Sequence, residues 1–445
     1  MIESKRYFGR IFFPDKPDVK ISGAWLTIAE KSISIEAPIN THKNDDWPIV
    51  LGEFNGLDKV TLLNCRSGGG SSGAGGTYGI IKARFILAGI HIHTNDELKF
   101  NRATLFSSAL ENWIRENEWI DEEGESKYVI PKPKEIVNTN IESFSIVINT
   151  GHSIRQGVEL HAHKVCTVQF ISEIPTHFND LLESIRHLKK LILFLTNKNP
   201  EFESAYFFIG DYQVELLNTS SPLEDKKFTQ FIRIEYSEVK SYLTQLIQNW
   251  FTQKRLYPVV DLVLEKCFNT QMSSEGFFLN VCVAMESFHR RFGKENVKKI
   301  KLDEPQNKQA IIELLKDNCE LLKWFKDKST EWEKPSLKER LFEFKGTVKY
   351  VIGTVFPFDI EEFIKRTVQT RNDMAHEGEH GKRFSDIELF LASKVIEYTL
   401  RLEILKLFGV NVNSTSRSLM DEAKNNIETL ARLNDYNQFE ILKNT

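Results

Sequence analysis

The spacing of apolar residues changes near residue 230, and this change limits the folds open to the chain. Before it, apolar and polar residues alternate as in half-buried β-strands over 19–28, 32–37 and 60–65. Further strands are expected over 83–92, 144–148, 157–160, 166–171 and 206–209, with a helix over 178–195. After it, helical spacing dominates and predicts helices over 238–250, 259–267, 276–292, 308–326, 335–352, 359–375 and 386–408.

These patterns predict an α+β protein, in which a β-rich N-terminal half is followed by an all-α helical bundle. We place the β-rich domain at 1–225, the bundle at 230–412 and a helical appendage at 413–445. The polar stretch 327–334 is expected to be a loop between two helices. Because the chain has 445 residues, it is too long for one ordinary core, and more than one domain is expected.

The composition indicates a soluble globular protein. The chain is 41% hydrophobic and 27% charged with a net charge of −4, so any nucleic-acid surface has to be a local patch. The five cysteines include no Cys-x-x-Cys pair, which argues against a disulfide framework or a cysteine zinc site and fits a reducing cytoplasm. The N-terminus does not resemble a signal peptide, and the longest apolar runs, such as 191–195, are too short to span a bilayer. We therefore expect a cytoplasmic protein without membrane contact.

Two features of the first half suggest binding sites but have simpler explanations. The glycine-rich stretch 67–76 is flexible by composition and lacks the Gly-Lys-Ser/Thr ending of a phosphate-binding loop, so a hairpin connection is expected. His91 with His93, and His161 with His163, each place two imidazoles on one face of a strand, where they could hold a metal. Neither pair has a clear third ligand, so a polar strand face is the alternative and no metal or cofactor is expected.

The residues most informative about function are 371–376, with the sequence Arg-Asn-Asp-Met-Ala-His. They end a helix that Asp359 is expected to cap, with Glu362 three residues later. One apolar face of this helix consists of Ile360, Phe363, Ile364, Thr367 and Val368. The next position on that face is Arg371, which needs a partner because an unpaired buried charge is costly. His376 lies where the helix is expected to end, close to Gly378.

Two interpretations of Arg371 and His376 are open from the residues alone. In the structural one, Arg371 pairs with a carboxylate of a neighbouring helix, and His376 interacts with the helix dipole. In the functional one, both take part in chemistry, Asn372 orients either of them, and Asp373 faces solvent.

The helix expected over 276–292 carries candidate partners for this motif. Glu286 and Arg290 are four residues apart, a spacing that favours a local ion pair, but Glu286 or His289 could also fix Arg371 in place. Residues 289–301 contain six cationic residues and one acidic residue, which makes this segment the best candidate for contacting phosphates in an acidic protein. The cationic residues are Arg290, Arg291, Lys294, Lys298, Lys299 and Lys301. A solvated helix face is the alternative.

Residues 371–376 resemble the Arg-x4-His signature of HEPN domains, on the helix where that family carries it. Residues 284–290 and 335–341 resemble the flanking helices of the ApeA-like HEPN branch. Segments 22–26, 49–53 and 60–65 are similar to the ApeA N-terminal domain, so the resemblance spans nearly the whole chain.

The resemblance implies a metal-independent endoribonuclease that acts in abortive-infection defence against phage by degrading cellular RNA, with tRNA as one candidate target. It also implies a homodimer or higher homo-oligomer formed through the HEPN domain, so that two Arg-x4-His motifs face one cleft. The N-terminal half would then sense a trigger, for which a phage-derived molecule is one candidate. Arg371, His376 and Asn372 would be the catalytic residues, with Glu286 and His289 in support.

The chemistry of these residue types agrees with RNA cleavage. The 2′-hydroxyl of RNA can serve as the nucleophile, so the protein has to supply a group that moves protons near neutral pH and a cation that holds the phosphate. His376 and Arg371 suit these two tasks. Five residues of an ideal helix turn by about 140°, however, so the two side chains would not share a face. Either the helix unwinds at Ala375 and His376, or the two residues act at a cleft at the helix tip, which a second protomer would help to form.

Two other functions are compatible with the sequence. A non-catalytic HEPN-type module could bind RNA or a protein partner without cleaving anything. A metal-dependent enzyme could instead use the His-x-His pairs of the β-rich half.

Overall fold

The computed structural model divides into two compact units. The first comprises Met1–Ile232 and Leu243–Thr252, and the second comprises Arg233–Tyr242 and Gln253–Thr445. The structure describes residues 4–29, 32–73, 76–114, 119–122, 125–128, 133–156, 160–197, 200, 202, 204–217, 234–269, 271–293, 305–332, 336–352, 360–376, 384–412, 421 and 425.

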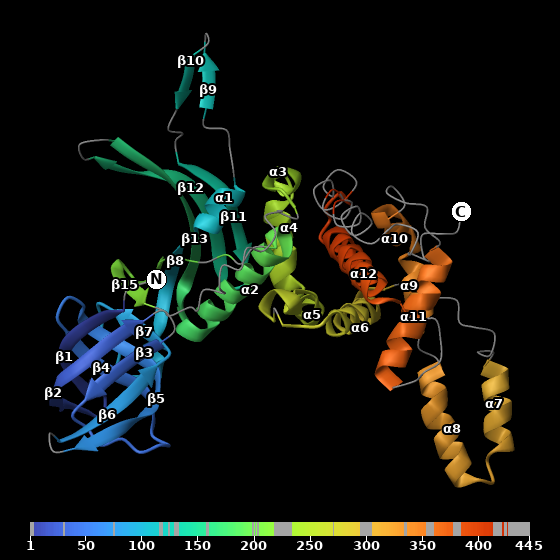
Figure 1. The fold of residues 1–445 in the computed structure, drawn as a ribbon, viewed down its shortest axis with the longest axis horizontal. Coiled ribbons are helices and arrows are strands. Elements are labelled where there is room, and N and C mark those ends of the chain that lie inside the picture. The colour runs from blue at the N-terminus through green and yellow to red at the C-terminus, as the bar shows by residue number, and fades with distance from the viewer. Residues whose placement is uncertain are drawn as a thin grey trace. The chain divides into compact units, whose positions relative to one another are not determined.

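A closed barrel forms the start of the first unit (Figure 1). Its antiparallel strands pair in the order β5, β4, β1, β2, β3, β6, and β6 pairs back to β5. Their bounds are β1 Lys5–Phe13, β2 Lys16–Ala29, β3 Ser32–Ala37, β4 Asp46–Phe54, β5 Asp58–Gly73 and β6 Gly76–Ala83. Alternate residues such as Ile33 and Ile35 fill the barrel core. At Gly9 a Cβ would lie 2.1 Å from the carbonyl oxygen of Glu53, so β1 and β4 approach each other as only glycine permits.

A curved sheet continues from the barrel strand β5. It runs in the order β7, β15, β14, β8, β13, β12, β11. The bounds are β7 Phe85–Ala88, β8 Lys99–Phe106, β11 Lys134–Ile141, β12 Phe144–Gln156, β13 Leu160–His177, β14 Ser204–Ile209 and β15 Tyr212–Leu217. A separate hairpin joins β9 Trp119–Glu122 to β10 Glu125–Tyr128, and a 3-10 turn, η1, spans Asn95–Glu97.

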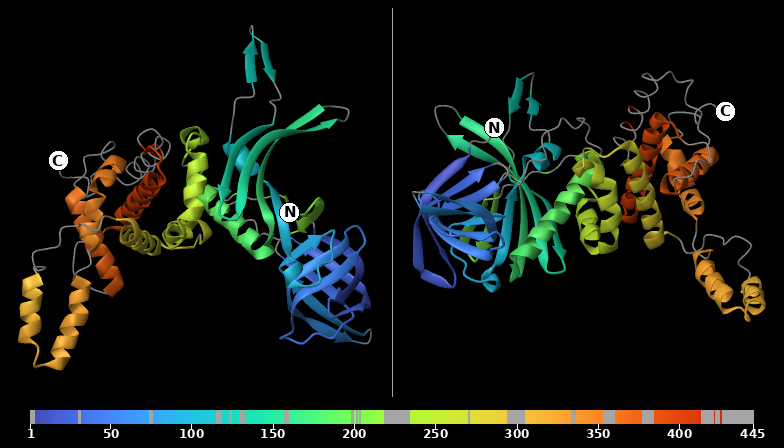
Figure 2. Two further views of the ribbon diagram at one scale, coloured as in Figure 1. Left: turned by 180° about the vertical axis from the view of Figure 1, so that it is seen from behind. Right: turned by 60° about the horizontal axis from the view of Figure 1, so that its bottom comes forward.

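Helices cover this curved sheet (Figure 2). They are α1 Ser108–Trp113, α2 Phe178–Thr196 and α4 Leu243–Thr252. Helix α2 buries an apolar stripe that begins at Phe178 and Leu181 at helical spacing, and it packs on β13 and β8. The indole Nε1 of Trp250 in α4 donates a hydrogen bond of 2.9 Å to the carbonyl oxygen of His187 in α2, which ties the two helices together.

The second unit is a bundle around α6 Ser274–Phe292, which packs against α5 Tyr257–Phe268, α9 Leu337–Glu343, α11 Ile360–His376 and α12 Asp386–Leu407. Its other elements are α3 Tyr236–Val239, η2 Lys254–Leu256, α7 Pro305–Leu314, α8 Cys319–Trp332 and α10 Lys345–Ile352. Helix α6 supplies Phe278, Val281 and Met285 to the core, as its spacing predicts. None of the helices in the described ranges combines the length and apolar character needed to cross a membrane.

The structure confirms the predicted β-rich half followed by a helical half, and it corrects several boundaries. The helix predicted over 238–250 is two helices, α3 and α4, whose buried residues pack in different units. The helix predicted over 308–326 breaks before Asn318, whose side chain caps α8 by accepting a hydrogen bond from the backbone N–H of Leu321. The helix predicted over 335–352 breaks at Phe344. The loop predicted at 327–334 is wrong up to Trp332, which ends α8.

In the first half, the glycine-rich stretch is largely strand. Residues 67–73 belong to β5 and Gly76 begins β6, so the predicted hairpin is present, with strand pairing that extends to Gly73 and Gly76. Of the strand predicted over 83–92, only β7 and Ala83, the last residue of β6, are strand. The rest of β6 was not predicted, nor were β1, β4, β8, β9, β10, β11 and β15. The predicted domain boundary at 225 and 230 lies outside the described residues, as does the appendage 413–445 except for residues 421 and 425.

Candidate functional site

Helix α11 presents Arg371 at the edge of the bundle core. The helix buries Phe363, Ile364, Thr367 and Thr370, and Arg371 follows on the same side with 27% of its side chain exposed. The apolar spacing therefore places a guanidinium where it is partly covered by protein and partly open to solvent. Residue Asp359, the predicted cap of this helix, lies outside the described residues.

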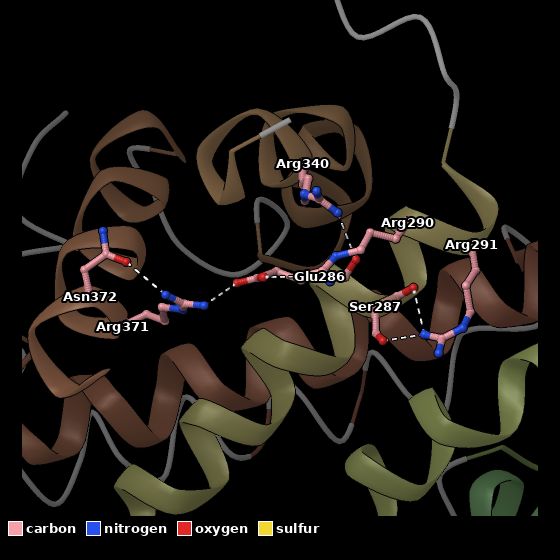
Figure 3. Close-up of polar contacts among 7 residues, drawn as sticks. All are labelled: Glu286, Ser287, Arg290, Arg291, Arg340, Arg371 and Asn372. Atoms are coloured by element: carbon pink, nitrogen blue, oxygen red, sulfur yellow. Dashed lines mark hydrogen bonds and ion pairs between the residues drawn. The ribbon is translucent and has the colours of Figure 1, made fainter. Parts of the chain in front are cut away.

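Glu286 of α6 is the partner that Arg371 was predicted to need (Figure 3). Arg371 Nη2 lies 3.1 Å from Glu286 Oε1, and the Glu286 side chain is 12% exposed. Although the distance is that of a hydrogen bond, Oε1 accepts no well-directed hydrogen bond. The contact is therefore an ion pair, which directs the guanidinium less strictly than a bidentate pair would.

Asn372 also holds Arg371. Arg371 Nη1 donates a hydrogen bond of 3.2 Å to Asn372 Oδ1. The prediction that Asn372 could orient the arginine is thus matched by a direct contact. Asp373 was predicted to face solvent, but it is buried, so that prediction is wrong. It lies three positions after the buried Thr370 and therefore shares that residue's face of the helix.

Two more arginines converge on Glu286 (Figure 3). Arg290 Nη2 donates a hydrogen bond of 3.1 Å to Glu286 Oε2 while 61% of the Arg290 side chain remains exposed. Arg340 of α9 donates one of 3.1 Å to the backbone carbonyl oxygen of Glu286. We call Arg290, Arg340 and Arg371 the arginine cluster. Arg290 and Arg371 pair with the Glu286 carboxylate and Arg340 with its backbone carbonyl, so three cations surround one acidic residue.

Arg340 was missed as a site residue by sequence reasoning. It is buried, and burial, together with the nearby positive charge of Arg290, lowers the pKa of its guanidinium. The available signal was its spacing, because Leu337, Arg340 and Leu341 share a helical face, as Val368 and Arg371 do. A charged residue on such a face needs a partner, and here the partner includes the backbone of α6.

The other predicted supporting residue, His289, and the predicted RNA-binding residue Arg291 form contacts away from Arg371. His289 is buried and its Nε2 contacts Glu343 of α9, not Arg371. Arg291 donates hydrogen bonds back to the carbonyl and hydroxyl oxygens of Ser287, away from the arginine cluster (Figure 3). Four further predicted cationic residues lie outside the described ranges, namely Lys294, Lys298, Lys299 and Lys301.

The backbone of α11 stays helical through Ala375 and His376. Unwinding at these two residues, one of the two expected ways to bring Arg371 and His376 together, is therefore ruled out in this structure. Only the backbone of His376 is described, and residues 377–383 lie outside the described ranges. The end of the helix places His376 at the tip of α11, about one and a half turns beyond Arg371.

His91 and His93 do not form part of a metal-ligand set among the described side chains. Residues 91–93 are not in a strand, which corrects the prediction, and His91 Nε2 lies 2.9 Å from the carbonyl oxygen of Gly52. Burial lowers the pKa of the His91 imidazole. His161 and His163 lie in β13, and their side chains are not described. Within the described side chains, no group of three potential metal ligands is present.

Family comparisons agree with this architecture. The model of ApeA N-terminal domain 1 matches residues 6–250, and the model of Apea-like HEPN matches residues 279–414. The second range contains the whole arginine cluster and His376. No curated protein and no solved structure matches the chain. Since the first model alone covers more than half of the sequence, the chain belongs to the ApeA family of anti-phage proteins with a C-terminal HEPN domain.

Proposed function

We propose that this protein is an endoribonuclease that cleaves cellular RNA without a metal ion, with tRNA as a candidate substrate, in abortive-infection defence against phage. One observation carries the proposal: Arg371 is held at a partly exposed position by Glu286 and Asn372, at the start of an Arg-x4-His motif. HEPN domains are generally ribonucleases, and the matched HEPN range includes this motif.

The reaction needs no nucleophile from the protein. The 2′-oxygen of a ribose forms a bond to the adjacent phosphorus, and the bond from phosphorus to the 5′-oxygen breaks. One proton leaves the 2′-hydroxyl and one is delivered to the departing 5′-oxygen, which leaves a 2′,3′-cyclic phosphate and a 5′-hydroxyl. His376 would move these protons, since imidazole titrates near neutral pH, and such a group contributes about 10²–10⁴-fold.

Arg371 would hold the phosphate while negative charge grows on its oxygens. A guanidinium has five N–H donors, and among the described residues only Asn372 accepts a directed hydrogen bond from Arg371. N–H groups on its exposed side therefore stay available for phosphate oxygens. Glu286 and Asn372 would keep the guanidinium in one orientation, which lowers the cost of ordering it during the reaction.

A second copy of the chain would complete the site. Since α11 is helical to its end, the positions of Arg371 and His376 in one chain are about 140° apart around the helix axis. Two copies packed with their α11 tips together would place the histidine of one chain near the arginine of the other. A homodimer or higher homo-oligomer through the HEPN domain is therefore part of the proposal.

The alternative is a HEPN module that binds RNA or a protein without cleaving it. The observation in its favour is that Arg371 is already neutralised by Glu286 within the chain. A site built only for binding could use the same arginine cluster.

The test is to sequence RNA ends after expression of the wild type, Arg371→Ala and His376→Ala in cells, with Arg291→Ala as the matched control. New 5′-hydroxyl ends should appear with the wild type and Arg291→Ala, and should fall at least 10²-fold with His376→Ala. Equal cleavage by the folded wild type and His376→Ala would refute the catalytic role. RNA binding without new ends under any trigger would favour the binding module.

A further inference from the structure

A row of outward-facing side chains crosses four strands of the barrel. Phe8 of β1 is paired in register with Trp25 of β2, Trp25 with Glu36 of β3, and Glu36 with Ile80 of β6. Leu26, next to Trp25 in the chain, is fully buried in the barrel core. Since neighbouring residues of a strand point to opposite faces, the row lies on the outer surface.

A second row runs beside the first, two residues along each strand. Arg6 is paired with Thr27, Thr27 with Ser34, and Ser34 with Lys82. Residues two apart on a strand share a face, so this row is also on the outer surface. It consists of two cations and two hydroxyl groups, with no acidic or apolar residue. We call it the cation row, and the first row the aromatic row.

The two rings of the aromatic row are open to solvent. Phe8 is 45% exposed and Trp25 37%, and their ring centroids lie 5.0 Å apart. The Arg6 guanidinium lies 4.6 Å from the centre of the Trp25 ring, and Arg6 Nη2 donates a hydrogen bond of 2.8 Å to Glu36. Contacts between adjacent strands therefore hold the aromatic surface and its cation in a fixed arrangement.

We propose that these two rows bind single-stranded nucleic acid. Bases would stack on Phe8 and Trp25, as bases stack on exposed aromatic side chains of a sheet in known RNA-binding modules. Phosphates would follow the cation row, with Arg6 and Lys82 supplying charge and Thr27 and Ser34 supplying hydroxyl donors. Charge favours this partner over a protein, because the two rows carry two cations, Arg6 and Lys82, against one carboxylate, Glu36, which is paired with Arg6 and not with Lys82.

This inference is independent of the proposed ribonuclease activity. The test therefore uses a labelled 2′-O-methyl oligoadenylate, in which the 2′-oxygen cannot act as a nucleophile, and the full-length chain. Fluorescence anisotropy should show that Trp25→Ala binds about tenfold more weakly than the wild type, the effect of losing one stacked base. Val19→Ala is the matched control, since Val19 is exposed on the same strand but belongs to neither row. A protein that cleaves no RNA would still give this result.

Lys82→Ala tests the cation row separately. Removing one phosphate contact should lower the slope of log affinity against log salt by about 0.7. Phe8→Leu serves as a second ring variant, because leucine keeps an apolar cross-strand contact if Trp25→Ala disturbs the barrel.

Two results would overturn the proposal. One is the absence of probe binding by the wild type. The other is equal binding by the wild type, Trp25→Ala and Phe8→Leu, with binding lost instead in Arg290→Ala. That outcome would put all nucleic-acid contact in the helical unit and leave the aromatic row for a protein partner.

Discussion

The β-rich unit and the helical unit bury different kinds of polar residue. In the described part of the β-rich unit, the buried polar residues are uncharged: Thr61, Thr104, Ser107, Thr139, Ser172 and Thr196. Its ion pairs lie on the surface, as with Arg6 and Glu36, whose side chains are each about half exposed. The helical unit buries ionisable side chains as well: His289, Arg340, Arg366, Asp373, Glu388, Glu397 and Arg401.

This difference shows what each unit requires of its sequence. A hydroxyl group can be buried with one hydrogen bond, whereas a buried ion costs several kcal/mol unless a partner is close. The helical unit therefore depends on specific charged pairs to hold its helices in place. In the β-rich unit, backbone pairing between strands does this, and the ion pairs of the barrel stay on its outer surface.

Two kinds of charged group stand out in the helical unit: enclosed ion pairs and the arginine cluster. Arg366 of α11 forms a bidentate pair with Glu388, with both distances 3.1 Å, and Glu388 also caps α12 through Ser385. Arg401 and Glu397 pair within α12. These pairs are fully enclosed and serve the packing of the bundle. The arginine cluster differs because Arg290 and Arg371 reach solvent, which makes it the group suited to a ligand.

The largest expected effect on stability is that of Arg366→Ala. It leaves the Glu388 carboxylate buried without its bidentate partner, so the free energy of unfolding of the helical unit should fall by about 3–5 kcal/mol. Urea denaturation followed by circular dichroism measures this loss. Arg6→Ala, which breaks an exposed pair on the barrel, should cost at most about 1 kcal/mol. Equal losses in the two variants would mean that burial of charge does not distinguish the units.

An effect of intermediate size is expected on the salt dependence of RNA binding, when Arg290→Ala is compared with Arg291→Ala. The two arginines are neighbours on α6, but only Arg290 belongs to the arginine cluster, whereas Arg291 is bonded to Ser287. Arg290→Ala should remove one phosphate contact and reduce the salt slope of binding by about 0.7, and Arg291→Ala should leave it unchanged. Filter binding at several salt concentrations would detect this. If Arg291→Ala has the larger effect, the ligand approaches α6 from its other side.

The pairing of Arg371 could be predicted in part from sequence, because the high cost of burying an unpaired charge can be recognised from the local helical pattern alone. A guanidinium on the apolar face of the helix over 359–375 needs a partner, and Glu286 was one of two candidates on the neighbouring helix. The choice between Glu286 and His289 could not be made, since it depends on how α9 supplies Glu343 to His289. Arg340 was missed although it shares a helical face with Leu337 and Leu341, because its partner is a backbone carbonyl of α6, which no pattern of side chains shows.

The fold was predictable where local pattern and tertiary packing agree. Helix α11 and strand β3 follow their apolar spacing closely. Helix breaks at 240–242 and 315–318 were missed because the helical pattern continues across them, and packing in different directions decides where the helix stops. Residues 67–73 were expected to be flexible from their glycine content, yet pairing between β5 and β6 supplies backbone hydrogen bonds that composition does not show.

The smallest expected effect concerns the pH dependence of the barrel. Hydrogen bonds from Arg10 and Lys20 lower the pKa of Glu53 below its ordinary value of 4.5. A carboxyl with a lowered pKa in the folded state stabilises the fold above pH 4.5, and this contribution is lost as the pH falls through the folded-state pKa. Because the pair is exposed, the loss should be under about 1 kcal/mol. Thermal unfolding of the wild type and Glu53→Gln between pH 7 and pH 3 would measure it, and the difference between them should shrink at the acidic end. A difference that stays constant with pH would show that the charge of Glu53 does not contribute to the stability of the barrel.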